Sequence, residues 1–189
     1  LARAYETTGQ QDVALATLDR IVKDYPAARE IAEVHFRRGE LLFSAKRYAD
    51  AQAAYEQVIA RGAGGSGFYD QSLYKHGWSL FKESQYEACL GSFAKLLDRT
   101  LIDRRTGRPR GFEQLTRPER ELAEDTLRVM GIAFSYQDGA KSIDELLAGR
   151  RSTPYAWLLY ARLGDLYVQK QRFQDAATTY RAFVARDPV

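Results

Sequence analysis

The chain has few residues with reactive or metal-binding side chains. It contains one cysteine, Cys89, and two histidines, His35 and His76, among its 189 residues. A single cysteine excludes a disulfide within the chain and leaves the redox compartment open. These three side chains are too few and too widely spaced for a zinc site or for a histidine-based catalytic set. We therefore expect no catalytic residue, no metal and no cofactor, and we expect all three to pack as interior residues.

Long apolar runs and a strong charge of one sign are also missing. No run approaches the roughly 18 apolar residues that a membrane helix needs, so this segment is not expected to insert into a membrane. The net charge is +3, which is too small to indicate nucleic-acid binding. No signal peptide is visible. Because the chain opens with Leu1 and lacks an initiator methionine, we expect a fragment or a processed form.

No stretch alternates apolar and polar residues over the length of a strand. In residues 33–60 the apolar side chains instead recur at intervals of three and four, which is the period of an α-helix. The five prolines stand at positions 26, 109, 118, 154 and 188, where they indicate helix starts or ends. The sequence therefore predicts an all-α protein.

A common spacing repeats after three glycines, Gly39, Gly77 and Gly164. The residues nine, twelve and sixteen positions later are an aromatic, a small and an aromatic residue: Tyr48, Ala51 and Tyr55; Tyr86, Cys89 and Phe93; Phe173, Ala176 and Tyr180. A glycine inside a helix costs about 1 kcal/mol relative to alanine, so its recurrence predicts a second helix crossing too closely for a side chain. We expect the small residue to lie at that crossing, with the aromatics on either side. Each unit would be a helical hairpin that buries its apolar face only by stacking on its neighbours.

These residues resemble the tetratricopeptide repeat, a helix–turn–helix of about 34 residues. In the last unit the matching residues are Tyr160, Leu163, Gly164, Tyr167, Ala176, Tyr180, Phe183 and Pro188. The resemblance implies a right-handed α-solenoid of stacked hairpins across the single array 1–189. Its predicted parts are a partial repeat at 1–28, repeats at 32–62, 70–98 and 157–189, a degenerate repeat at 124–150 and a basic insertion at 99–120.

Two departures from the repeat length mark insertions. Gly39 and Gly77 are 38 residues apart, and the loop containing "GAGGSG" at 62–67 accounts for the excess. Those letters satisfy G-x-G-x-x-G, but that fingerprint indicates nucleotide binding only between a strand and a helix. After a helix they predict a C-terminal cap and a linker.

The larger insertion is rich in arginine. We consider Arg104, Arg105, Arg108 and Arg110 as a possible accessory basic loop that contacts an acidic partner. The alternative is a solvated loop, which is the usual role of a charge run. Phe112 is the only aromatic residue there, so a platform for stacking nucleic-acid bases is lacking.

The resemblance also implies that the first helix of each hairpin lines an inner groove where peptides or partner helices bind. The predicted protein-binding residues are Phe36, Glu40, Phe43, Tyr74, Trp78, Phe81, Arg128 and Asp165. Further inward positions include Asp125, Ile132, Ser135, Tyr136, Leu158, Val168 and Gln169. Members that clamp the C-terminal carboxylate of chaperones carry Lys and Asn at places held here by Phe36, Glu40, Tyr74 and Trp78, so chaperone binding by a carboxylate clamp is not expected. The alternative for the aromatic residues is packing against a neighbouring repeat.

The sequence as a whole predicts a non-catalytic scaffold that binds a protein or peptide partner. Two alternatives stay open: a structural spacer in a larger repeat protein, and an accessory domain of an enzyme whose catalytic part lies elsewhere. Stretches such as "IVKDYP" and "YRAFVARDP" are similar in style to repeats of bacterial envelope proteins. That similarity slightly favours a periplasmic or envelope location.

Overall fold

The computed structural model describes residue 5, residues 9–150 and residues 153–186. The described part of the chain consists of helices joined by turns and loops, with one isolated antiparallel bridge between Ile102 and Pro109. The chain divides into two compact units, unit 1 (1–85) and unit 2 (86–189). The first residues of the predicted partial repeat and Pro188 of the last repeat lie outside the described residues.

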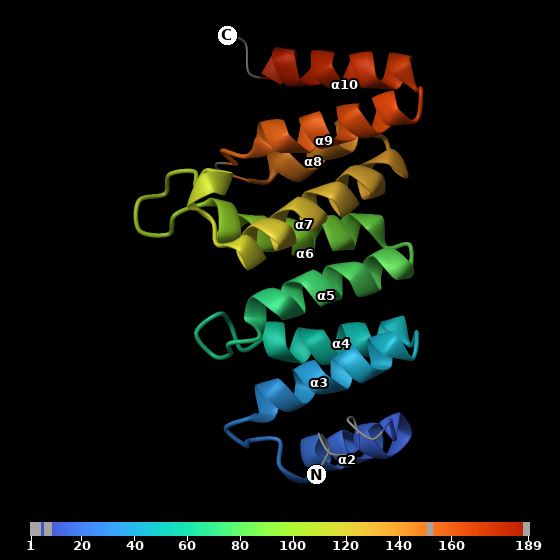
Figure 1. The fold of residues 1–189 in the computed structure, drawn as a ribbon, viewed down its shortest axis with the longest axis vertical. Helices are drawn as coiled ribbons and strands as arrows, with labels where there is room; N and C mark the ends of the chain where they lie inside the picture. The colour runs from blue at the N-terminus through green and yellow to red at the C-terminus, as the bar shows by residue number, and fades with distance from the viewer. Residues whose placement is uncertain (1–4, 6–8, 151–152, 187–189) are drawn as a thin grey trace. The chain divides into compact units, whose positions relative to one another are not determined.

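Unit 1 is a series of helices in which each packs against the next in chain order. They are α2 (Gln11–Asp24), α3 (Ile31–Ser44), α4 (Tyr48–Ile59) and α5 (Tyr69–Lys82) (Figure 1). The core of the α3–α4 hairpin consists of Leu42, Ala51, Ala54 and Tyr55, with Leu15, Phe36 and Phe43 packed against it. Ala51 and Tyr55 are the small and aromatic residues of the repeated spacing, and both are fully buried.

Unit 2 contains α6 (Tyr86–Leu101), α7 (Arg117–Ser135), α8 (Ala140–Ala148), α9 (Ala156–Gln169) and α10 (Phe173–Arg186) (Figure 1). Helix α7 packs against α6 on one side and α9 on the other, and α9 also packs against α8 and α10. Phe93, Leu127, Phe134 and Tyr160 are fully or almost fully buried between these helices. No helix among the described residues combines the length and apolar character needed to cross a membrane.

Two of the repeated glycines, Gly39 and Gly164, are each covered by an aromatic ring. A Cβ atom added at Gly39 would lie 2.5 Å from Cε1 of Tyr55, and one added at Gly164 would lie 2.4 Å from Cζ of Tyr180. The prediction that a side chain has no room at these glycines is confirmed for both. The predicted arrangement was wrong in one respect, because the ring sixteen residues later lies over the glycine itself rather than beside the crossing.

The degenerate repeat uses its glycine differently. A Cβ atom at Gly131 would be 3.5 Å from the carbonyl oxygen of Arg162, an ordinary van der Waals contact with α9. Sixteen residues after Gly131 stands Leu147, which is aliphatic and buried. Gly131 therefore supports the approach of α7 to the first helix of the next hairpin.

The turns inside the regular hairpins share a left-handed residue seven positions after the glycine. Lys46, Ser84 and Gln171 have φ values of 60°, 59° and 58°. In each turn the following amide donates to a carbonyl five residues back, as Arg47 N does to Leu42 O at 2.9 Å. This is the Schellman arrangement that ends many helices, usually with glycine at the left-handed position. Because lysine, serine and glutamine are not typical at this position, these caps could not be predicted from the sequence.

Tyrosine hydroxyl groups join helices by donating to carboxylates. Tyr55 donates to Glu40 Oε1 at 2.5 Å, Tyr155 to Asp98 Oδ1 at 2.7 Å, Tyr160 to Asp144 Oδ1 at 2.5 Å and Tyr180 to Asp165 Oδ1 at 3.1 Å. Burial, followed by the adjacent carboxylate, raises the pKa of each of these phenols above its usual value. The hydroxyls therefore stay protonated and remain hydrogen-bond donors.

The two predicted loops differ in their degree of structure. The glycine-rich loop lies between α4 and α5, with Gly62 at φ 73° shortly after α4, so it lacks the preceding strand that the nucleotide fingerprint requires. The basic insertion is shorter than the expected 99–120, because α6 continues to Leu101 and α7 begins at Arg117. A capping box formed by Thr116 and Glu119 starts α7 seven residues before the expected position 124.

Cys89 occupies the place that alanine holds in the other regular units. Its side chain is fully buried, which confirms the predicted interior position. Burial raises the pKa of the thiol to about 12. The thiol is therefore protonated at neutral pH, and a protonated, buried cysteine is a poor nucleophile.

Candidate functional site

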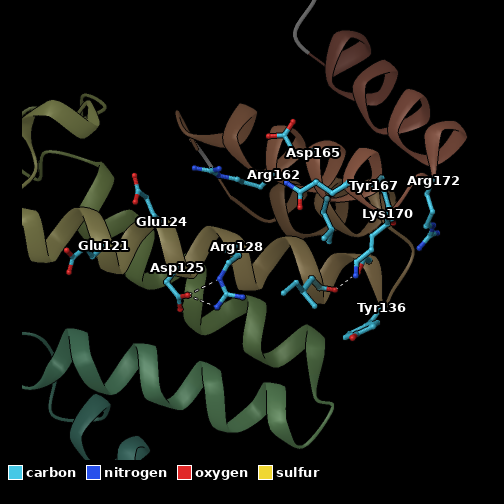
Figure 2. Close-up of a pocket in the computed structure, with 14 residues that line it drawn as sticks. Glu121, Glu124, Asp125, Arg128, Tyr136, Arg162, Asp165, Tyr167, Lys170 and Arg172 are labelled. Carbon is cyan, nitrogen blue, oxygen red and sulfur yellow. Dashed lines mark hydrogen bonds and ion pairs between the residues drawn. The ribbon is translucent and has the colours of Figure 1, made fainter.

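A groove with a volume of about 1300 Å³ lies between α7 and α9 in unit 2 (Figure 2). Fourteen residues line it: Glu121, Glu124, Asp125, Arg128, Ile132, Ser135, Tyr136, Arg162, Asp165, Leu166, Tyr167, Gln169, Lys170 and Arg172. Eight of these carry a charge. The groove therefore carries many charged side chains and lies between the first helices of two successive hairpins.

Helical spacing places these side chains on one side of each helix. Along α7 the lining positions 121, 124, 125, 128, 132 and 135 are separated by one, three or four residues, which keeps them on one face. On α9 the lining positions 162, 165, 166 and 169 follow the same rule. Gly131 and the backbone of Arg162 hold the two helices in contact beneath this surface.

The amino-terminal half of α7 supplies three of the four carboxylates that line the groove, and Asp165 on α9 is the fourth. Asp125 accepts from Arg128 at 2.5 Å, so these two charges largely neutralise each other (Figure 2). Glu121 accepts from Arg117 at 2.8 Å. Glu124 is exposed and forms no ion pair within the described part of the chain.

The opposite end of the groove carries cations and aromatic rings. Lys170 is exposed, and the described residues give it no ion-pair partner. Arg172 donates to Asp175 at 2.7 Å and lies over the ring of Tyr167 at 4.4 Å from its centroid. The ring of Tyr136 lies 5.2 Å from that of Tyr86, yet Tyr136 remains 62% exposed.

The structure brings together most of the inward positions expected in this unit. Arg128 and Asp165 both line the groove, as do Ile132, Ser135 and Gln169. Two other expected positions do not: Leu158 is buried and Val168 is not a lining residue. The binding role of Arg128 and Asp165 stays a prediction.

Sequence reasoning missed five charged residues of the groove. These are Glu121, Glu124, Arg162, Lys170 and Arg172. Glu121 lay outside the expected degenerate repeat, which was taken to begin at 124. Two features of the sequence indicate an earlier start of this helix than position 124. They are the capping box of Thr116 and Glu119 and the helical spacing of Glu121, Glu124, Asp125 and Arg128.

In unit 1 the predicted residues Phe36 and Glu40 line a smaller cavity of about 230 Å³, with Arg37, Leu41 and Phe68. Phe36 stacks on Phe68 with ring centroids 4.9 Å apart. Glu40 accepts hydrogen bonds from Tyr55 at 2.5 Å and from Lys75 Nζ at 3.0 Å, so it joins α3, α4 and α5. The Glu40 carboxylate is therefore already bonded on both oxygens.

The other predicted residues of unit 1 pack on one another. Phe43 meets Tyr48 edge to face at 5.2 Å and has Lys75 over its ring. Trp78 makes edge contacts with Tyr74 at 6.4 Å and Phe81 at 5.6 Å. All four predicted residues, Phe43, Tyr74, Trp78 and Phe81, are half-buried. Their role as a binding strip stays a prediction.

Arg110 does not serve as a free cation of the basic loop. Its Nη1 donates to Thr100 O at 3.1 Å and Glu119 Oε1 at 3.2 Å, and its Nη2 donates to Gln114 O at 3.2 Å and Glu119 Oε2 at 3.4 Å. These bonds hold the Arg110 guanidinium within the loop and against α6 and α7, and a contact between Arg110 and a partner stays a prediction. Arg104, Arg105 and Arg108 are exposed, and no described residue forms an ion pair with them.

Replacement of Arg110 by alanine is expected to lower the free energy of unfolding by about 2 kcal/mol, because it leaves Glu119 and two carbonyl groups without their charged donor. Arg108→Ala in the same loop is the matched control, with an expected change within about 0.5 kcal/mol. Urea unfolding measures both values, and hydrogen exchange should show faster exchange in residues 102–116 of Arg110→Ala alone. Equal effects of the two substitutions would contradict the assigned closing role.

Comparisons with known proteins support this architecture. The family described as tetratricopeptide repeat matches residues 1–66 and 135–189, which is more than half of the chain. No curated protein matches the sequence. One similar solved structure is that of MamA, whose sequence is 12% identical to this chain. The structural alignment covers 99% of this chain and 94% of MamA, with a TM-score of 0.57. A second is YrrB, described as a TPR protein with an unusual peptide-binding site, which is 14% identical in sequence. Its alignment covers 99% of this chain and 83% of YrrB, with a TM-score of 0.53.

A third similar structure is PilF of Pseudomonas aeruginosa, with 16% identity, 98% and 72% coverage and a TM-score of 0.51. At these identities the likeness shows the fold alone. Together with the helical hairpins of each unit, it confirms the predicted fold class of an α-solenoid. The extent of the family match shows more: the chain belongs to the tetratricopeptide repeat family.

Proposed function

We propose that this chain is a non-catalytic interaction scaffold and that the groove between α7 and α9 binds a segment of a partner protein. The observation that carries the proposal is the groove itself, which is about 1300 Å³ and open along two adjacent first helices. Pockets for drug-sized molecules are typically about 300–1,000 Å³. The volume therefore supports a ligand larger than a small metabolite, and a protein segment is such a ligand.

The family and the fold support the same proposal at a coarser level. Tetratricopeptide repeats in general form scaffolds for protein–protein interaction. The similar structure of YrrB is described as having a peptide-binding site, and we extend that role to this chain as part of the proposal. The half-buried rings of unit 1, such as Trp78 and Phe81, are a further candidate surface.

Site-specific photocrosslinking tests whether the groove binds a partner. A benzophenone amino acid replaces Lys170 inside the groove or Lys141 on α8, which is an exposed lysine outside it. In an extract of the source cells, position 170 should give a discrete crosslinked protein that excess unmodified chain competes away. Position 141 should not give this product.

Three other outcomes would contradict the proposal. Identical products from positions 170 and 141 would indicate contact without groove specificity. The same amino acid can also replace Trp78 on α5 in unit 1, and crosslinking from position 78 but not from position 170 would place the site on α5. No competed product from any position would favour the spacer role.

A further inference from the structure

We propose that the segment bound between α7 and α9 is an extended peptide with a basic side chain toward Glu121 and Glu124 and an acidic side chain toward Lys170 and Arg172. This inference rests on the proposed function and specifies the chemistry of the partner. It follows from the shape of the groove and from the distribution of charge along it.

The composition of the lining favours an extended segment over an amphipathic helix. A helix that binds in a groove buries an apolar face, so the groove it enters must be largely apolar. Here only Ile132 and Leu166 of the fourteen lining residues are aliphatic, and eight are charged. An extended peptide instead presents polar backbone groups and alternating side chains, which suit such a lining.

The length of the groove sets the size of the peptide. Glu121 and Tyr136 mark its ends along α7, and fifteen helical steps of 1.5 Å correspond to about 22 Å. An extended chain advances about 3.3 Å per residue, so this length accommodates about seven residues. A peptide of that size spans both charged ends at once.

The acidic end has carboxylates available to a ligand. Glu124 has no ion pair among the described residues, and the pair formed by Glu121 and Arg117 is exposed, with side chains 62% and 90% accessible. Exposed pairs of this kind contribute only about 0–1 kcal/mol, so a ligand cation can compete for Glu121. Asp125 and Arg128 neutralise each other and leave the local excess negative.

The other end has the opposite character. Past Ile132 on α7 and Leu166 on α9, the lining residues are Ser135, Tyr136, Tyr167, Gln169, Lys170 and Arg172, with two cations and no carboxylate (Figure 2). Arg172 is paired with Asp175, but this pair is exposed, with side chains 49% and 48% accessible, so a ligand carboxylate can compete for Arg172 as a ligand cation can for Glu121. Lys170 is the cation of this end without an ion pair among the described residues. Tyr136 adds an exposed ring beside these cations.

The residues between the two ends do not change this polarity. Arg162 and Asp165 have opposite charges and together add no net charge. Asp165 also accepts a hydrogen bond from Tyr180 at 3.1 Å. The charge therefore changes sign along the groove, from negative beside the first half of α7 to positive beside the carboxyl ends of α7 and α9.

A displayed library of random seven-residue peptides tests the inference on the whole chain. Wild type should enrich peptides that carry Lys or Arg near one end and Asp or Glu near the other. The variant Glu124→Lys should lose the basic preference, and Lys170→Glu should lose the acidic one. The control Lys141→Glu changes an exposed charge on α8 outside the groove and should retain both preferences.

A synthetic peptide from the wild-type selection then gives a quantitative result. Its dissociation constant should rise about tenfold with Lys170→Glu and stay within twofold with Lys141→Glu, since reversal replaces an attraction by a repulsion. Raising the salt concentration should weaken wild-type binding because exposed charges are screened. Equal melting temperatures establish that the variants are folded.

The outcomes separate this inference from the proposed function. Enriched peptides with no charge preference, or with a preference that neither reversal changes, overturn the inference. An absence of enriched peptides together with competed crosslinking at position 170 overturns the inference alone. An absence of both overturns the inference and the proposed function.

Discussion

Gly39→Ala is expected to lower the free energy of unfolding by about 2–3 kcal/mol, although alanine is the better helix former by about 1 kcal/mol. The added Cβ would lie 2.5 Å from Cε1 of Tyr55, well inside van der Waals contact. Tyr55 cannot move aside cheaply, because its ring is fully buried and its hydroxyl is bonded to Glu40. Urea unfolding of the two proteins measures the difference.

Two other glycines provide matched controls for this substitution. Gly91 lies inside α6, and a Cβ there would have no atom within 4 Å, so Gly91→Ala should raise stability by up to about 1 kcal/mol. Gly164→Ala should cost less than Gly39→Ala, because the Tyr180 ring that it meets is 39% exposed and can swing outward. A Gly39→Ala protein as stable as wild type would show that the Tyr55 ring does not prevent a side chain at this position.

Acidification from pH 7 to pH 5 is expected to lower the stability of unit 1 by about 2 kcal/mol through His35. Burial, then the charges of Arg61 and Arg38, lower the pKa of His35 to about 4. Its side chain is 6% exposed, and its Nδ1 has no hydrogen-bond partner among the described residues. The folded state therefore holds this imidazole neutral.

The direction of the pH effect follows from the two states of His35. The unfolded chain binds a proton below its usual pKa of 6.5, whereas the folded chain binds it only near pH 4. Neutral His35 therefore makes its full contribution to the free energy of unfolding above about pH 6.5. This contribution decreases as the pH falls toward 4, where the total loss reaches about 3 kcal/mol.

A variant that lacks His35 isolates this effect from other titrations, because His76 and the carboxylates are the same in both proteins. His35→Leu keeps an interior side chain but cannot be protonated, so its stability should change much less between pH 7 and pH 5. Trp157, which is 53% exposed in unit 2, can be replaced by phenylalanine in both proteins so that Trp78 reports unfolding of unit 1. Parallel pH profiles for the two proteins would contradict the role of His35.

The hairpins, the core and the family could be predicted from the sequence because they depend on local periodicity. Apolar residues spaced three and four apart predict helices. A glycine followed at fixed distances by a small residue and an aromatic residue predicts a pair of packed helices. Gly39, Ala51 and Tyr55 were identified in this way, and all three are buried at one crossing. The position of Cys89 in the interior followed from the same rule.

Other features depend on which side chains meet, and the sequence alone did not determine these. No spacing rule indicates that Glu119 and the carbonyls of Thr100 and Gln114 bind the Arg110 guanidinium. Glu40 was expected to face a ligand, but Tyr55 and Lys75 occupy its carboxylate. Apart from Gln114, which is four residues from Arg110, these partners lie nine to thirty-five residues away, beyond the range of helical periodicity.

The sequence by itself therefore determined which residues share a face, and the tertiary structure decided which faces stay open. A spacing rule places Phe36 and Arg128 alike on the inner side of a first helix, and it contains no information about what covers them. In the folded chain Phe36 stacks on Phe68, whereas Arg128 lines the groove between α7 and α9. The physical reason is that helix formation is local, whereas the burial of a side chain depends on the packing of neighbouring helices.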